Sequence, residues 1–132
     1  MPIIGFSFDK ILVEKLNTAK GNIKINVRID IKEITKEELK FGEKETIKIS
    51  FVFSVEYEPK IASLSLEGNV FFTEESKKIK KILDGWKNKK LEEEIRASIF
   101  NFIITKCNVK ALQLEEELGI PFHLPMPRVK ES

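Results

Sequence analysis

The side chains that could carry acid–base or nucleophilic chemistry in this sequence are single and scattered. His123 is the only histidine, and it lies between prolines near the C-terminal end. Cys107 is the only cysteine. A histidine-based pair or triad needs a partner that orients the ring, and no residue close to His123 in the sequence offers one. We therefore predict no catalytic residues and expect the protein not to be an enzyme.

The sequence also shows no pattern of residues typical of a metal site or of a phosphate-binding loop. Zinc sites gather cysteines and histidines, and neither residue type comes in pairs here. Glu92, Glu93 and Glu94 stand together, but they fall in the first turn of a predicted helix, where the helix dipole favours negative charge. The six glycines are isolated, so the sequence has no glycine-rich phosphate loop. We predict neither a metal nor a cofactor, and we interpret Cys107 as a small apolar residue on a helix.

Length and composition indicate one folded domain covering residues 1–132. The chain is 42% hydrophobic and 33% charged, which is typical of a folded soluble protein rather than a disordered one. A single cysteine excludes an internal disulfide and fits a reducing compartment. No apolar run reaches the roughly 18 residues of a membrane span, and the N-terminus lacks the pattern of a signal peptide. We therefore expect a cytoplasmic protein.

A lysine-rich stretch, residues 77–90, is the strongest charge feature of a chain whose formal net charge is only +2. The first five of its seven lysines lie around the side of a predicted helix opposite Ile79, Ile82, Leu83 and Trp86. We favour a solvated face, and we keep open an adaptor or nucleic-acid-associated module acting through this helix. Residues 111–120 imitate the start of a helix-turn-helix, but the prolines that follow prevent a recognition helix. Glu115, Glu116 and Glu117 would also face phosphates, so we do not expect DNA binding.

Alternating apolar and polar residues predict four strands within about residues 5–72. The first contains a register change near Asp9 and Lys10, as a bulge would produce. Gly68, inside the fourth, suggests a bulge or a close backbone contact. We expect a polar loop at residues 34–44, and an antiparallel meander covered on one face by helices. The predicted strands are Gly5–Leu16, Ile23–Lys32, Ile47–Tyr57 and Ile61–Phe72.

Two helices are predicted within about residues 74–118, followed by an extended, proline-rich tail at 119–132. The first spans roughly Glu74–Asn88, with Thr73 as its cap. The second spans Leu91–Gly119, about 40 Å at 1.5 Å per residue. Its first half is apolar nearly all round, so it needs cover on more than one side. We expect the sheet to cover one side and a second subunit the other, through Ile95, Ile99, Phe102 and Ile103.

The layout resembles the SecB family of export chaperones over about residues 5–128. The matching parts are the bulged first strand GFSFDKILVEKL, the fourth strand LSLEGNVFF, the long helix and the extended tail IPFHLPMPRV. The resemblance implies an α+β domain in which a four-stranded antiparallel sheet carries a short and a long C-terminal helix on one face. It also implies a homotetramer built as a dimer of dimers through the long helices. Members hold unfolded chains in aromatic-rich grooves without ATP, metal or nucleotide.

The resemblance places contacts with unfolded clients on aromatic and apolar residues of the same regions: Phe71, Trp86, Phe122 and Met126, with Phe72 in the core. Family members that serve export present acidic residues to the motor SecA. The outward face of the second predicted strand instead carries Lys24, Asn26, Arg28, Asp30 and Lys32, so we do not expect SecA as a partner. We also keep open a small oligomeric ligand-binding protein whose pocket lies between sheet and helices.

Overall fold

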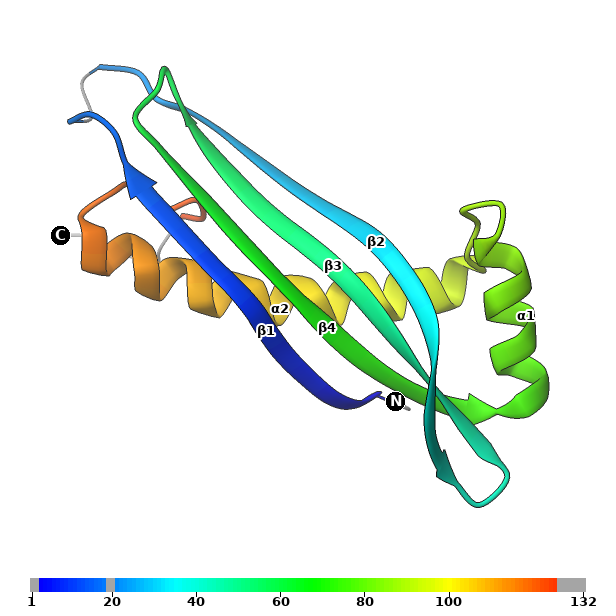
Figure 1. The fold of residues 1–132 in the computed structure, drawn as a ribbon. Coiled ribbons are helices and arrows are strands. Elements are labelled where there is room, and N and C mark those ends of the chain that lie inside the picture. Colours follow the sequence, from blue (N-terminus) through cyan, green and yellow to red (C-terminus); the bar gives the residue numbers. More distant parts are fainter. Residues whose placement is uncertain (1–2, 19–20, 126–132) are drawn as a thin grey trace, which may run out of the picture.

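The computed structural model describes residues 3–18 and 21–125 of the chain. Its four strands form one antiparallel sheet in the order β1-β4-β3-β2, and the two helices follow (Figure 1). The long helix crosses one face of the sheet, and the short helix lies at one end of it (Figure 1). The elements are β1 (Ile3–Lys15), β2 (Lys24–Phe41), β3 (Lys44–Glu58), β4 (Ala62–Glu75), α1 (Ser76–Trp86) and α2 (Glu93–Leu118).

The strand order corrects the predicted meander, while the predicted class of fold is confirmed. Only β2, β3 and β4 follow one another through the sheet, because β1 pairs with β4 and not with β2. This order places the two most apolar strands, β3 and β4, in the centre. The edge strands β1 and β2 carry more exposed side chains, which suits edges that face water.

Strand β2 is longer than predicted, because residues 34–41 continue it where we expected a loop. A register shift between Ile31 and Glu33 adds one residue to the strand. Ile34, three residues after Ile31, therefore faces the core opposite Ile49. The polar residues beyond Ile34 belong to the end of the β2–β3 ribbon that projects past the helices (Figure 1). There Lys36 forms an ion pair of 3.0 Å with Glu45 of β3.

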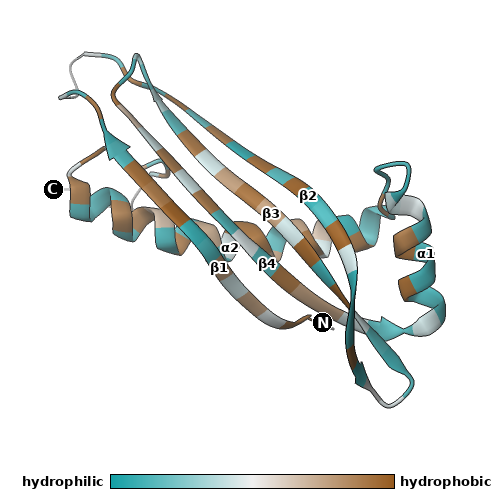
Figure 2. Ribbon diagram, viewed as in Figure 1, coloured by the Kyte–Doolittle hydropathy of each residue, from teal (hydrophilic) through white to brown (hydrophobic). Residues whose placement is uncertain are grey.

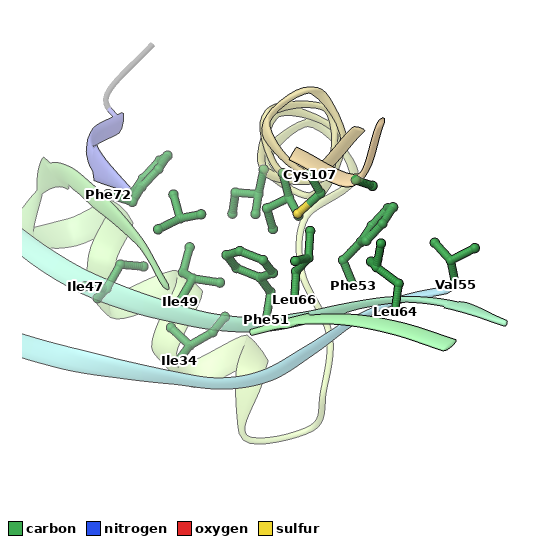
Figure 3. Packing of buried hydrophobic residues seen from close by; sticks show 14 of the residues in the cluster. Ile34, Ile47, Ile49, Phe51, Phe53, Val55, Leu64, Leu66, Phe72 and Cys107 are labelled. Atoms are coloured by element: carbon green, nitrogen blue, oxygen red, sulfur yellow. The ribbon is translucent and has the colours of Figure 1, made fainter. Parts of the chain in front are cut away.

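Strands β3 and β4 supply most of the core, as their alternation predicted. Every predicted inward residue of the two strands is buried, and Figure 2 shows the resulting alternation of apolar and polar residues along the sheet. In Figure 3, Phe53, Leu64 and Leu66 point toward the helix that carries Cys107. The buried inward residues are Ile47, Ile49, Phe51, Phe53, Val55, Tyr57, Leu64, Leu66, Val70 and Phe72.

Both predicted irregularities of the sheet are confirmed. The pairing of β1 with β4 shifts register between Phe8 and Lys10, so Asp9 is the extra residue of a bulge. Gly68 pairs with Phe8 in this region. A Cβ atom on Gly68 would lie 2.3 Å from the backbone oxygen of Ser7, so only glycine allows the two backbones to approach this closely.

The helices begin later than predicted. Thr73 belongs to β4 and donates its hydroxyl hydrogen bond to the backbone oxygen of Glu45, so it does not cap α1. Helix α2 ends at Gly119, which takes the predicted left-handed conformation with φ of 67°. The buried side of α2 is a row spaced by four residues, which lies over the sheet (Figure 3). The row consists of Ile99, Ile103, Cys107, Ala111 and Glu115.

The described part of the tail, residues 120–125, is not helical, as predicted, and it bends at His123 and Leu124. Phe122 and Leu124 are exposed, whereas Ile120 and the side chain of His123 are buried. Met126 lies outside the described residues. No helix in the described ranges is long and apolar enough to cross a membrane.

Candidate functional site

A buried polar cluster joins the sheet, α2 and the tail at one end of the molecule. Tyr57, at the end of β3, donates its hydroxyl hydrogen bond to Oε2 of Glu115 on α2. Nδ1 of His123, in the tail, lies 2.9 Å from Oε1 of the same carboxylate. The backbone N–H of His123 also donates to Glu115, at 3.2 Å. Nε2 of His123 lies 2.8 Å from Oδ1 of Asn108. We call these four residues the tail cluster.

The tail cluster holds the tail on the domain and cannot reach a substrate. The side chains of His123 and Glu115 are only 1% and 0% exposed, whereas a general acid or base must touch the group whose proton it moves. Burial raises the pKa of Tyr57 above its ordinary value, and the hydrogen bond to Glu115 raises it further. Tyr57 therefore stays a neutral donor that satisfies the buried carboxylate.

The sequence analysis missed this cluster, although one signal for it was present. The sequence analysis considered Glu115 only together with Glu116 and Glu117, as side chains that would face phosphates, whereas Glu115 is fully buried. It continues the four-residue row through Cys107 and Ala111. A glutamate at a core position of a helix must find donors, and the only histidine stands eight residues further on.

The three predicted client-binding residues that the structure describes do not form one site. Phe71 lies on the sheet face opposite Phe72, and its ring covers Gly5 of β1. Trp86 is the last residue of α1, whereas Phe122 lies in the tail beyond the other end of α2 (Figure 1). Met126 lies outside the described residues. The structure therefore distributes the predicted contacts over three separate surfaces.

Trp86, one of the predicted contacts, lines a cleft together with other apolar residues. The cleft has a volume of about 260 Å³ and lies between β2, the α1–α2 connection and α2. Lys89 lies over the Trp86 ring at 4.6 Å from its centroid, and Arg96 lies 5.3 Å from the centroid of Phe100. We call this space the aromatic cleft. It is lined by Ile29, Asp30, Ile31, Trp86, Lys89, Leu91, Arg96 and Phe100.

Two of the four predicted assembly residues belong to the core of the single chain. Ile99 and Ile103 are both 0% exposed beneath the sheet, so they have no surface left for a second subunit. Ile95 and Phe102 are half-buried beside them. Phe102 packs edge-on against Phe6 of β1, with 5.7 Å between ring centroids. Of the four residues predicted for the subunit interface, only Ile95 and Phe102 keep some exposed surface.

Further apolar surface on α2 is open to solvent at positions that the sequence analysis did not select. Ile104 is 36% exposed and Val109 is 68% exposed. Both are β-branched apolar residues on a helix whose other side already covers the sheet.

The lysines of residues 77–90 are exposed, as predicted, and several have acidic neighbours. Lys78 pairs with Glu74, and Lys87 pairs with Asp84, at 3.9 and 3.7 Å. Lys81 reaches across to Glu92, at the start of α2, at 3.9 Å. Exposed pairs of this kind contribute little stability, but they lower the net positive charge of the helix surface.

The remaining reactive group, the thiol of Cys107, is buried in the core. Burial raises the pKa of Cys107 to about 12, so the thiol is protonated and unreactive at neutral pH. Among the residues that the structure describes, no group of three or more histidine, cysteine, aspartate or glutamate side chains is placed to hold a metal ion.

Comparison with known proteins defines the fold as that of the SecB-like chaperones. The chain is similar to the SecB-like chaperone Rv1957 of Mycobacterium tuberculosis, solved in complex with a ChAD peptide from the Rv1956 HigA1 antitoxin. The match covers 98% of this chain and 91% of that chain, with a TM-score of 0.53 and 11% sequence identity. No protein-family model and no curated protein matches the sequence. The SecB-like fold predicted from the layout is confirmed.

Proposed function

We propose that this protein is an oligomeric holdase that binds apolar segments of non-native polypeptides without ATP. The single observation that carries the proposal is the aromatic cleft, which presents Trp86 and Phe100 to solvent on a fold of the SecB-like type. Open apolar surface bordered by charged side chains is typical of a site for another polypeptide. Because every unfolded chain exposes apolar side chains, such a site binds with little sequence preference.

The chemistry of the aromatic cleft suits an extended peptide. Ile29 and Ile31 of β2 offer aliphatic contacts, while the two aromatic rings offer larger apolar faces. Lys89 and Arg96 border these rings and remain able to bind backbone carbonyl oxygens of the client. The similar protein Rv1957 was solved with a peptide of an antitoxin, which supports a linear segment as the class of ligand. A link to protein export stays a prediction, and we do not include SecA.

Self-association is the second part of the proposal. We expect a dimer or tetramer formed through α2, where Phe102 is only half-buried and Ile104 and Val109 are exposed. The sheet covers only one side of this helix (Figure 1). We place the assembly in the cytoplasm, because the single cysteine is buried and unpaired, as in proteins of reducing compartments.

One set of measurements tests both parts. Mass by light scattering gives the oligomeric state, and light scattering of a chemically denatured client gives the suppression of aggregation at low and high salt. We expect suppression to persist at high salt, because burial of apolar surface is not screened. The variant Trp86→Ala should suppress aggregation less. Leu39→Thr, which changes an apolar side chain 53% exposed elsewhere on β2, should match the wild type. A strict monomer without suppression would refute the proposal.

A second candidate is an adaptor or nucleic-acid-associated module that acts through residues 77–90. The exposed lysines of α1 favour it, and their pairs with Glu74, Asp84 and Glu92 weigh against it. Binding of nucleic acid depends on the release of counterions, so its affinity falls steeply as salt rises. The same salt series therefore separates the two candidates, since the holdase retains its client at high salt.

A further inference from the structure

A groove between α1 and the start of α2 differs in character from the aromatic cleft. It has a volume of about 650 Å³ and is open to solvent. A second hollow of about 350 Å³ continues it toward β4 and shares Lys81, Ile82, Glu92 and Ile95 with it. We call the larger space the lysine groove. It is lined by Lys77, Lys80, Lys81, Ile82, Asp84, Gly85, Lys90, Leu91, Glu92 and Ile95.

The floor of the lysine groove is aliphatic, and the backbone fixes its shape. Ile82 is 4% exposed, and Leu91 and Ile95 are half-buried against the core. The connection between the helices turns back over Gly85, whose backbone oxygen accepts a hydrogen bond of 3.0 Å from the backbone N–H of Lys90. A Cβ on Gly85 would lie 2.8 Å from the backbone oxygen of Lys90. Glycine at this position thus lets the connection close one wall of the groove.

The rim of the lysine groove is positively charged. Four lysines line it against the two carboxylates of Asp84 and Glu92, which gives a net charge of +2. Asp84 pairs with Lys87, and Glu92 pairs with Lys81. In the described part of the chain, no carboxylate lies within ion-pair distance of the other three rim lysines: Lys77, Lys80 and Lys90.

We propose that the lysine groove docks a short segment of a partner protein in which an apolar side chain is flanked by carboxylates. The apolar side chain would be buried on the floor of Ile82, Leu91 and Ile95. The flanking carboxylates would reach Lys77, Lys80 and Lys90, which have no acidic partner within the described part of the chain. This selection by charge goes beyond the proposed holdase activity, which depends on apolar burial alone.

The lining favours a protein segment over a nucleic acid. A single strand is bound by aromatic rings on which its bases stack, whereas the floor of the lysine groove is aliphatic. Asp84 and Glu92 would also repel a continuous phosphate backbone. The test includes an oligonucleotide, so that this alternative is an outcome of the experiment.

Fluorescence anisotropy with short labelled peptides tests the proposal. The probe has one leucine flanked on both sides by glutamates, and the comparison peptides replace the glutamates with lysines or the leucine with serine. We expect only the original probe to bind, with affinity that weakens about tenfold or more between low and high salt. Equal binding of the lysine peptide, or binding of a single-stranded oligonucleotide in place of the probe, would overturn the proposal.

A matched pair of variants locates the site. Lys77→Glu combined with Lys80→Glu reverses two rim charges and should weaken binding of the probe about tenfold or more. Lys24→Glu combined with Lys32→Glu makes the same change of net charge on exposed positions of β2, and should bind like the wild type. If both double variants bind equally well, the lysine groove is not the site. Suppression of aggregation in the rim variant should be unchanged, so failure of the holdase and failure of this docking site are distinguishable.

Discussion

The most direct test of the buried architecture is Tyr57→Phe, which removes one oxygen atom from the tail cluster. Glu115 then keeps two donors, the backbone N–H of His123 at 3.2 Å and its Nδ1 at 2.9 Å. A hydrogen bond to a charged group contributes about 1.5–3 kcal/mol net. Because the phenylalanine ring preserves the packing and the carboxylate stays partly satisfied, we expect a loss of about 2 kcal/mol.

Urea unfolding followed by circular dichroism measures this loss. For a chain of this length, 2 kcal/mol corresponds to a fall in melting temperature of roughly 6–8 °C. The midpoint should move while the dependence on urea stays the same, since the folded state is unchanged. Glu116→Gln serves as the control, because Glu116 is exposed in the same helical turn. Its effect should lie within about 0.5 kcal/mol of zero.

A double-mutant cycle extends the test to the tail. Tyr57→Phe and His123→Ala remove donors from the same carboxylate, so their free energies of unfolding should not add, with an interaction of about 0.5 kcal/mol or more. A loss below about 0.5 kcal/mol for Tyr57→Phe would refute the reasoning. Additive effects in the cycle would show that Glu115 does not join the sheet to the tail.

Two further predictions concern the protonation of the core and the close backbone contact in the sheet. Burial raises the pKa of Cys107 to about 12 and also raises the pKa of Tyr57. The stability linked to each group is therefore fully present at a pH below its pKa in the unfolded chain, and it is lost as pH rises above that pKa. Stability should fall by about 1.4 kcal/mol per pH unit above pH about 9 through Cys107, and by about as much again above pH about 10 through Tyr57. Cys107→Ala should flatten the decline measured by urea unfolding at successive pH values. Gly68→Ala should cost about 3 kcal/mol, because the added Cβ would meet the backbone oxygen of Ser7 at 2.3 Å. Gly21 has a φ of +68° and open space around it, so Gly21→Ala should cost only about 1 kcal/mol. Equal losses in the free energy of unfolding for Gly68→Ala and Gly21→Ala would contradict the close-contact argument.

The candidate surfaces were only partly predictable. The aromatic cleft contains Trp86, which was predicted, and Phe100, which was not selected. The sequence identified the lysines of residues 77–90 as one charged feature. Which of them pair with carboxylates, and which line the lysine groove without a partner in the described part of the chain, depends on where α2 begins. Glu92 reaches Lys81 only because the connection folds back over Gly85. The distance between Glu92 and Lys81 depends on the conformation of the α1–α2 connection, which the periodicity of apolar residues does not predict.

Local patterns determined most of the strands and the layers of this protein, but not the second half of β2. Strict alternation identified the inward faces of β3 and β4, because a strand places successive side chains on opposite faces. The change of alternation near Asp9 revealed the bulge of β1, and Gly119 marked the end of α2. These features follow from the geometry of a few neighbouring residues, so the sequence alone suffices for them.

The tertiary structure alone decided which residues meet across the fold. Strand β1 pairs with β4, although β2 follows it in the chain. Ile99 and Ile103 turn toward the sheet, while Ile104 beside them faces solvent. Glu115 and His123 look like ordinary polar residues until the sheet brings Tyr57 to them. Burial and long-range hydrogen bonds depend on the packing of distant elements, and this packing brings the partners of the buried Glu115 together.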